Sequence, residues 1–322
     1  MTESDTLASL GESATLGRIF PRLPSAALEL LGPGDDSAIV AAPDGRYVVT
    51  TDMMIHGPDF RLAWSSPHDL GWKAAASNLA DIAAMGAVPT ALLVAIAAPA
   101  DSPVSLLEGI ADGLRDGCHA LAPGCGVVGG DLSVSSTLTI AVTAFGDLEG
   151  RAPILRSGAS VGDQVAVSGP LGAAASALRL LFTEAVDVEG EPDAGLAAAL
   201  RPRTGAQLAP TPPIGDGPLA ALAGATAMLD LSDGLAIDSA RLAKASRVGI
   251  DFHSASLGPD AAGALAGGED HSLLATFPAG AALPGGFRAV GVVRAGEGIS
   301  VDGAAVEGAG WDPYRGWNGR SG

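Results

Sequence analysis

Residues 66–98, SPHDLGWKAAASNLADIAAMGAVPTALLVAIAA, describe a helix followed by a buried strand. Ser66 is suited to cap the helix, Pro67 to occupy its first turn and Gly86 to stop it. The run over residues 90–98 is apolar on both faces, as in a strand at the centre of a sheet. The stretch therefore predicts a fold in which helices pack on a sheet.

One carboxylate stands inside the apolar part of that helix. Asn78 and Asp81 are three residues apart and share a face, while Leu79 and Ile82 supply apolar contacts. An unpaired charge in such surroundings is costly. We therefore expect Asp81 to bind a ligand; the alternative is that it simply faces water.

Further helix and strand patterns stand before and after residues 66–98. With the length of the chain they predict an α+β or α/β fold of two domains, residues 1–150 and 151–322, with a boundary near Gly150. Residues 186–195 and 210–218 have the composition of loops around a short helix. We expect further strands at 47–51, 137–145 and 165–169, one ending within 228–235 and one at 272–277, with helices at 102–117, 173–182 and 234–246.

The charge of the chain excludes several classes of partner. Asp and Glu number 36 against 18 Lys and Arg, giving a net charge of −18, and 25 of the acids are aspartates. Such a protein lacks the basic footprint of a nucleic-acid binder or of a protein that binds an anionic membrane. Residues 1–10 do not resemble a signal peptide, and the longest apolar run, residues 91–98, is too short to span a bilayer. We expect a cytoplasmic location.

The positions of seven aspartates are more informative than their number. A solvated acidic surface explains most of the excess, but the seven stand in Gly-flanked turns, at strand ends or on the apolar helix. The glycines before Asp131, Gly129 and Gly130, would let a backbone approach a phosphate closely. The seven are Asp35, Asp36, Asp52, Asp81, Asp131, Asp230 and Asp233.

Oxygen ligands without a His or Cys cluster favour Mg²⁺, Ca²⁺ or Mn²⁺ over zinc or copper. If these carboxylates converge, their repulsion requires several divalent ions. Mg²⁺ usually binds through few carboxylates together with substrate phosphates, so the set predicts a polyphosphate substrate and phosphoryl transfer. The residues do not decide whether Asp35 or Asp36 contacts the metal.

The ordered series of motifs resembles the thiamine-monophosphate kinases, in the superfamily that includes aminoimidazole ribonucleotide synthetase and selenophosphate synthetase. The matching segments are spread in order over about residues 30–320. They are residues 32–38, Thr50-Thr51-Asp52, 78–86, Gly129-Gly130-Asp131, Arg156-Ser157-Gly158-Ala159, 229–235 and Gly267-Gly268-Glu269-Asp270.

The resemblance implies a two-domain, synthetase-like fold and a homodimer. The N-terminal mixed α/β domain would bind ATP and Mg²⁺ and pair its sheet with that of a second copy, and the C-terminal α/β domain would complete the cleft. It also implies direct transfer of the ATP γ-phosphoryl group to thiamine monophosphate, giving thiamine diphosphate without a phosphoenzyme.

The resemblance further assigns roles to individual residues. Asp36, Thr50, Thr51, Asp52, Asp81, Asp131, Asp230 and Asp233 would bind several Mg²⁺ ions, and Asp52, Asp131 and Asp233 among them would be essential for catalysis. Gly130, Asp131, Arg156 and Ser232 would bind the nucleotide. Asp59, Glu269 and Trp317 would hold thiamine, because a carboxylate can meet the cationic thiazolium and an indole can stack on the pyrimidine.

Two other readings predict different chemistry. Another ATP-dependent synthetase of the same superfamily would carry a cysteine near its N-terminus or at its C-terminus, whereas the first cysteine here is Cys118 and the chain ends Arg320-Ser321-Gly322. A non-catalytic, acidic divalent-metal-binding protein would bind metal whether or not nucleotide is present.

Overall fold

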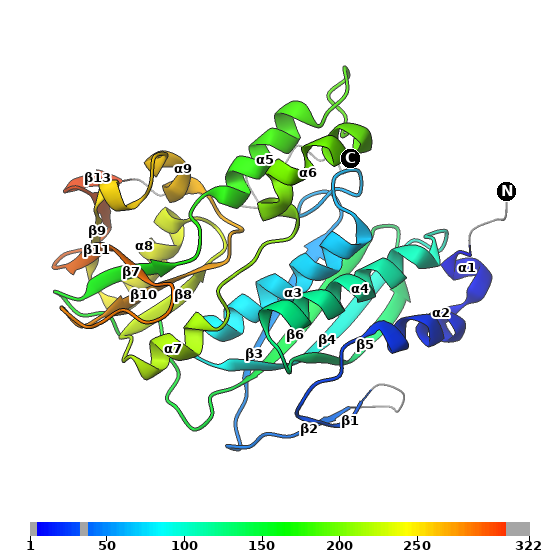
Figure 1. The fold of residues 1–322 in the computed structure, drawn as a ribbon, viewed down its shortest axis with the longest axis horizontal. Helices are drawn as coiled ribbons and strands as arrows, with labels where there is room; N and C mark the ends of the chain where they lie inside the picture. Colours follow the sequence, from blue (N-terminus) through cyan, green and yellow to red (C-terminus); the bar gives the residue numbers. More distant parts are fainter. Residues whose placement is uncertain (1–4, 33–37, 307–322) are drawn as a thin grey trace.

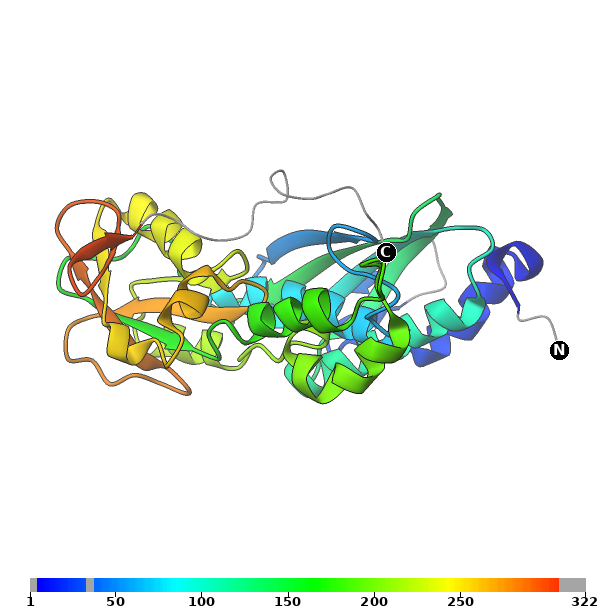
Figure 2. The ribbon, with the colours of Figure 1, turned by 90° about the horizontal axis from the view of Figure 1, so that it is seen from above.

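Two large sheets lie side by side along an elongated molecule (Figures 1 and 2). The computed structural model describes residues 5–32 and 38–306. The first sheet has the order β3 (Val48–Ile55), β6 (Thr139–Asp147), β4 (Val88–Ala98) and β5 (Gly126–Val134). β5 is parallel to β4 and the other pairs are antiparallel. The short strands β1 (Glu29–Leu31) and β2 (Ile39–Val40) pair separately.

Helices α3 (Pro67–Ala84) and α4 (Val104–Leu121) cover one face of the first sheet (Figure 1). α3 begins as predicted: the Ser66 hydroxyl accepts a bond from Asp69 N–H, and the Asp69 carboxylate accepts one from Ser66 N–H. In Figure 2 no described helix lies on the opposite face of this sheet. The short helices α1 (Leu7–Leu10) and α2 (Glu12–Ile19) lie beyond the β5 edge.

Two predictions about this half were wrong. Asp52 does not end its strand, because β3 continues to Ile55. The stretch Gly129-Gly130-Asp131 is not a loop but the middle of β5, where Gly130 lies directly against Val94 of β4: a Cβ on Gly130 would stand 1.8 Å from the Val94 carbonyl oxygen. The paired glycines therefore serve close strand packing.

The second sheet is mixed and has seven strands. Their order is β13 (Ala304–Val306), β12 (Ile299–Val301), β9 (Gly249–Phe252), β11 (Arg288–Arg294), β7 (Gln164–Ser168), β10 (Ser272–Phe277) and β8 (Ala227–Leu231). Helix α8 (Leu235–Ser246) packs on β8, β9 and β12, and α9 (Ala261–Ala266) packs on α8.

Helices α5 (Ala173–Glu184) and α6 (Ala194–Leu208) pack on each other, and α6 also contacts α3. α6 is longer than the predicted short helix and contains Pro202. The predicted loop over 210–218 partly forms α7 (Asp216–Leu222), which packs on α3 and β10. No helix among the described residues is long and apolar enough to cross a membrane.

One hydrophobic core joins the two sheets. α3 packs on β3, β4 and β6 of the first sheet and also on β8 and β10 of the second. The buried side chains of Leu79 and Ile82 therefore belong to the same cluster as Met228, Phe277 and Phe287. This arrangement brings the end of β8 to the side of α3 and β3, where the predicted aspartates stand.

Candidate active site

Four of the predicted carboxylates meet between the two sheets. Asp52 comes from β3, Asp81 from α3, Asp230 from the end of β8, and Asp233 from the turn that follows β8. Their charges act on one another: partial burial raises the pKa of Asp52, and although His271 lowers it, Asp230 and Asp233 raise it further. The structure thus gathers residues that are up to 181 positions apart in the chain.

Asp81 is the most perturbed of these acids. Burial, followed by the charges of Asp230 and Asp52, raises its pKa to about 7, although the Thr50 hydroxyl donates a hydrogen bond to it over 2.8 Å. Thr50 and Asp52 alternate along β3 and so share the face that α3 covers. Asp81 therefore does not simply face water. The negative charges of Asp52 and Asp230, which come from different halves of the molecule, disfavour the ionised form of Asp81.

His271 lies beside Asp230 of this group. Its Nδ1 lies 3.4 Å from Asp230 Oδ2, and only 5% of Asp230 and 7% of His271 are exposed. Burial disfavours the imidazolium, but the hydrogen bond to Asp230 and the charges of Asp230 and Glu269 raise the pKa of His271. In the sequence, only its place directly after Gly267-Gly268-Glu269-Asp270 pointed to His271.

The turn that carries Asp233 is held by two residues of α8. The Asp238 carboxylate accepts hydrogen bonds from the backbone N–H groups of Asp233 and Gly234 at 3.0 and 3.1 Å. Arg241 donates to Asp233 and to Asp238, each over 2.6 Å. Burial raises the pKa of Asp238 to about 6. Sequence reasoning missed Asp238; an acid within the first turn of a helix that starts at a predicted site is the signal that could have found it.

The two described residues predicted to hold thiamine also lie together. Asp59 follows β3, and its carboxylate accepts a hydrogen bond from Ile55 N–H over 2.7 Å. Burial raises its pKa, and the charge of Glu269 acts in the same direction. Glu269 in turn accepts hydrogen bonds from Lys73 on α3 and Gln207 on α6. The sequence had not singled out either of these two partners for this site.

Asp131 lies on the other face of the first sheet. Cross-strand pairing places it in one row with Ala95, Ala141 and Met53, whereas Asp52 is in the next row and points to the α3 side. Thr51 also points away from α3, where its hydroxyl accepts a hydrogen bond from Thr143 over 3.2 Å. Within one chain, Asp131 and Thr51 are therefore not brought to the four acids.

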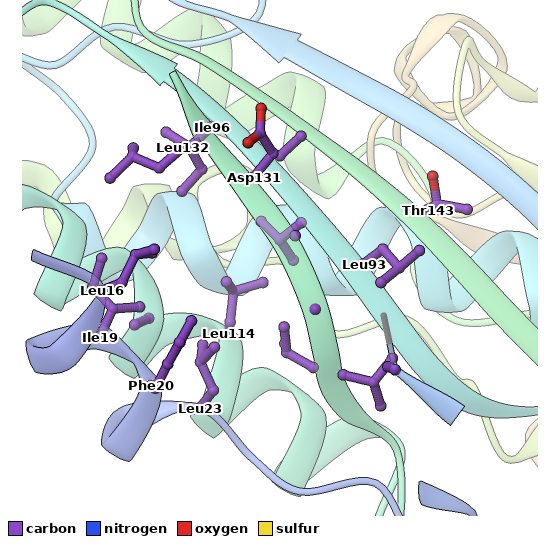
Figure 3. A pocket seen from close by; sticks show the side chains of 18 of the residues that line it. Leu16, Ile19, Phe20, Leu23, Leu93, Ile96, Leu114, Asp131, Leu132 and Thr143 are labelled. Atoms are coloured by element: carbon purple, nitrogen blue, oxygen red, sulfur yellow. The ribbon is translucent and has the colours of Figure 1, made fainter. Parts of the chain in front are cut away.

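A pocket of about 750 Å³ adjoins Asp131 (Figure 3). It lies along β4 and β5, beside α2 and α4, and includes Gly129 and Gly130. Apart from Asp131 and Thr143, the side chains labelled in Figure 3 are apolar. The pocket is thus suited to a mainly apolar group with a polar end near Asp131 and Thr143.

Ser232 and Arg156, both predicted to bind the nucleotide, lie in different places. Ser232 lies in the turn with Asp233, and its backbone oxygen accepts a bond from Glu269 N–H over 2.9 Å. Arg156 lies near the far end of α8, where its carbonyl accepts a bond from Ser246 over 2.7 Å. Because a 12-residue helix is about 18 Å long, Arg156 is well separated from Asp233 within one chain. Asp35, Asp36 and Trp317 lie outside the described residues.

The donors suit a hard cation such as Mg²⁺, since they are carboxylate and hydroxyl oxygens that repel one another when ionised. No three His, Cys, Asp or Glu side chains within residues 5–32 and 38–306 form a ready-made metal cage.

Comparison with known proteins shows the family of the chain. The family described as AIR synthase related protein, N-terminal domain, matches residues 34–148. Thiamine-monophosphate kinase of Mycobacterium tuberculosis (strain CDC 1551 / Oshkosh) is 43% identical over 98% of this chain and 93% of its own length. The chain belongs to the thiamine-monophosphate kinase family. The family is one of enzymes, and the fold is its mixed, two-domain fold.

Solved structures support the same family. The crystal structure of thiamine-monophosphate kinase from Stenotrophomonas maltophilia K279a superposes with a TM-score of 0.76 at 33% identity, covering 92% of this chain and 98% of that chain. AaThiL complexed with AMPPCP and TMP superposes with a TM-score of 0.72, also at 33% identity, covering 96% and 99%.

Proposed function

We propose that the chain transfers the γ-phosphoryl group of ATP to the phosphate of thiamine monophosphate, in a direct, in-line and Mg²⁺-dependent reaction that serves thiamine diphosphate biosynthesis. The observation that carries the proposal is the meeting of Asp52 and Asp81 with Asp230 and Asp233 between the two sheets. The binding of an ATP analogue and TMP by a relative of the same fold supports it.

The four acids would hold the metal ions. Asp52, Asp81, Asp230 and Asp233 offer several oxygens within one region, and Thr50 lies beside them. Bound Mg²⁺ would supply the positive charge that the phosphate oxygens need and that this acidic chain lacks. The chain itself contributes the fixed directions of these carboxylates, set by β3, α3 and the braced turn after β8.

Thiamine and the phosphates of the nucleotide would bind on the α3 side of the first sheet. Asp59 and Glu269 lie there, where their charges suit the cationic thiazolium, and Ser232, in the turn with Asp233, would contact the phosphates. The pocket beside Gly130 and Asp131 lies apart from this turn within one chain, so its use by the nucleotide stays a prediction. The assignment of Trp317 to the pyrimidine and of Arg156 to the nucleotide stays a prediction, as does a cytoplasmic location.

We also infer a homodimer that pairs the uncovered faces of the first sheets. That face carries large apolar side chains, of which Val49 is 56% and Met53 is 58% exposed. It also carries Asp131 and Thr51, so a second copy would lie against residues assigned to the nucleotide and metal sites. Light scattering coupled to gel filtration tests this, and a monomeric mass would contradict it.

A coupled assay with ATP, Mg²⁺ and either thiamine monophosphate or thiamine tests the proposed reaction. We expect thiamine diphosphate from the monophosphate and no product from thiamine. Asp52→Ala should lower kcat by at least about 100-fold because a metal ligand is lost, while Asp101→Ala, an exposed change in the turn after β4, should not. Phosphorylation of thiamine alone would overturn the substrate, and full activity of Asp52→Ala would overturn the site.

A further inference from the structure

Lys73 joins the two halves of the molecule at the proposed substrate site. Its Nζ donates to Glu269 Oε1 over 2.8 Å, and 8% of its side chain is exposed, against 31% of that of Glu269. A buried ammonium is costly unless it is paired, so this bond fixes both groups. The only other lysine of the chain, Lys244, lies exposed on α8.

Gln207 holds the second oxygen of the same carboxylate. Its Nε2 donates to Glu269 Oε2, while its own Oε1 is buried and has no hydrogen-bond partner among the described residues. A buried amide oxygen without a partner is unfavourable. The orientation of Gln207 is therefore set by its bond to Glu269.

The backbone conformation of Glu269 is also unfavourable. Glu269 has a φ of +64°, in the left-handed region that residues with a side chain rarely adopt. Its N–H donates to Ser232 O over 2.9 Å, and the preceding Gly268 lies so close that a Cβ would stand 2.2 Å from that oxygen. The carboxylate is thus attached to the turn that carries Asp233. Unfavourable conformations of this kind are concentrated at functional sites.

The surroundings of Glu269 contain a second carboxylate. Asp59 and Glu269 lie close enough for their charges to interact, and Lys73 acts on both. Two neighbouring carboxylates at one site favour a cationic ligand. Each oxygen of Glu269 keeps a lone pair after it has accepted one bond, so the residue can still contact a ligand at its exposed edge.

We propose that Lys73 and Gln207 are positioning residues of the substrate site, which orient Glu269 beside Asp59 to receive the cationic thiamine moiety. The inference rests on the proposed function and assigns its selectivity to residues of α3 and α6. A brace that only joined the two halves would need neither the left-handed Glu269 nor the unsatisfied amide of Gln207.

Steady-state kinetics of Lys73→Met, Lys73→Arg and Gln207→Leu test the proposal. We expect Lys73→Met to raise KM for thiamine monophosphate about 10-fold, which corresponds to the loss of one charge-assisted bond. KM for ATP and kcat should stay within about threefold of wild type. Lys73→Arg should recover part of the loss because it keeps the charge, and Lys244→Met is the matched control and should behave as wild type.

Gln207→Leu separates positioning from stability. It removes the donor to Glu269 together with the unsatisfied oxygen, so we expect KM for thiamine monophosphate to rise about threefold with little change in Tm. If folded Lys73→Met and Gln207→Leu keep the wild-type KM, the inference is wrong even if their Tm falls. If wild type does not phosphorylate thiamine monophosphate at all, the proposed function fails first, and the inference fails with it.

Discussion

Single side chains at the site are arranged for ligands rather than for the stability of the free protein. Asp81 and Asp238 both have a raised pKa because of burial, with neighbouring acids adding to it. A raised pKa in an acid means that folding disfavours its ionised form. The chain keeps these carboxylates although neutral groups of the same size would fit.

Asp81→Asn should stabilise the metal-free protein at pH 8, by about 1–3 kcal/mol, because it removes a charge that faces Asp52 and Asp230. The folded pKa lies above the ordinary value of 3.8, so the stability linked to Asp81 is present below about pH 4 and is lost as pH rises through about 7. Urea unfolding from pH 4 to 8 measures this, and activity should be lost. An equal pH slope in wild type and variant would contradict the prediction.

At the scale of elements, β5 explains why a glycine pair stands before Asp131. The sequence alone suggested a phosphate loop, but the pair lies within a strand whose partner, β4, approaches Gly130 too closely for a side chain. Asp131 is thereby fixed on a rigid strand and directed to the pocket side. The same spacing in a loop would leave its direction undefined.

Gly130→Ala should destabilise the protein by about 2–4 kcal/mol, because its methyl group would meet the Val94 backbone at 1.8 Å and β4 or β5 would have to shift. Gly129→Ala is the matched control: its methyl would meet only the end of the Leu93 side chain, at 3.1 Å, which can turn aside. Thermal unfolding of both variants decides this. Equal losses of Tm would show that strand packing is not the reason for Gly130.

At the scale of the whole molecule, α3 serves both sheets, so the two halves share a core. The Asp69 carboxylate, at the start of α3, also accepts two hydrogen bonds from Arg201 on α6. The boundary predicted near Gly150 lies between the two large sheets in the sequence. In space the sheets are not separated, because both contribute to one core. Unfolding of one half should therefore expose the core side chains of the other half to water.

Phe277→Ala, in β10 of the second sheet, should lower the stability of both halves by about 3–5 kcal/mol, because Phe277 is fully buried in the shared core. We expect one calorimetric transition and faster hydrogen exchange in α3, which belongs to the other half. Leu222→Ala, at a site that is 70% exposed, serves as the control. Two separate transitions, with α3 unaffected, would show that the halves unfold independently.

The sequence by itself determined the local features. The Ser66 cap, the length of α3, the apolar strand β4 and the chemistry of the aspartates could be predicted because they depend on neighbouring residues and on ligand preference. The family could be inferred because its motifs occur in a fixed order.

Only the tertiary structure decided which carboxylates face one another. It brings Asp52 and Asp81 to Asp230 and Asp233, sets Asp131 on the other face of the sheet, and selects Lys73 and Gln207 as partners of Glu269. Neither spacing nor composition contains this information, because charge interactions fall off with distance in space and not with distance along the chain.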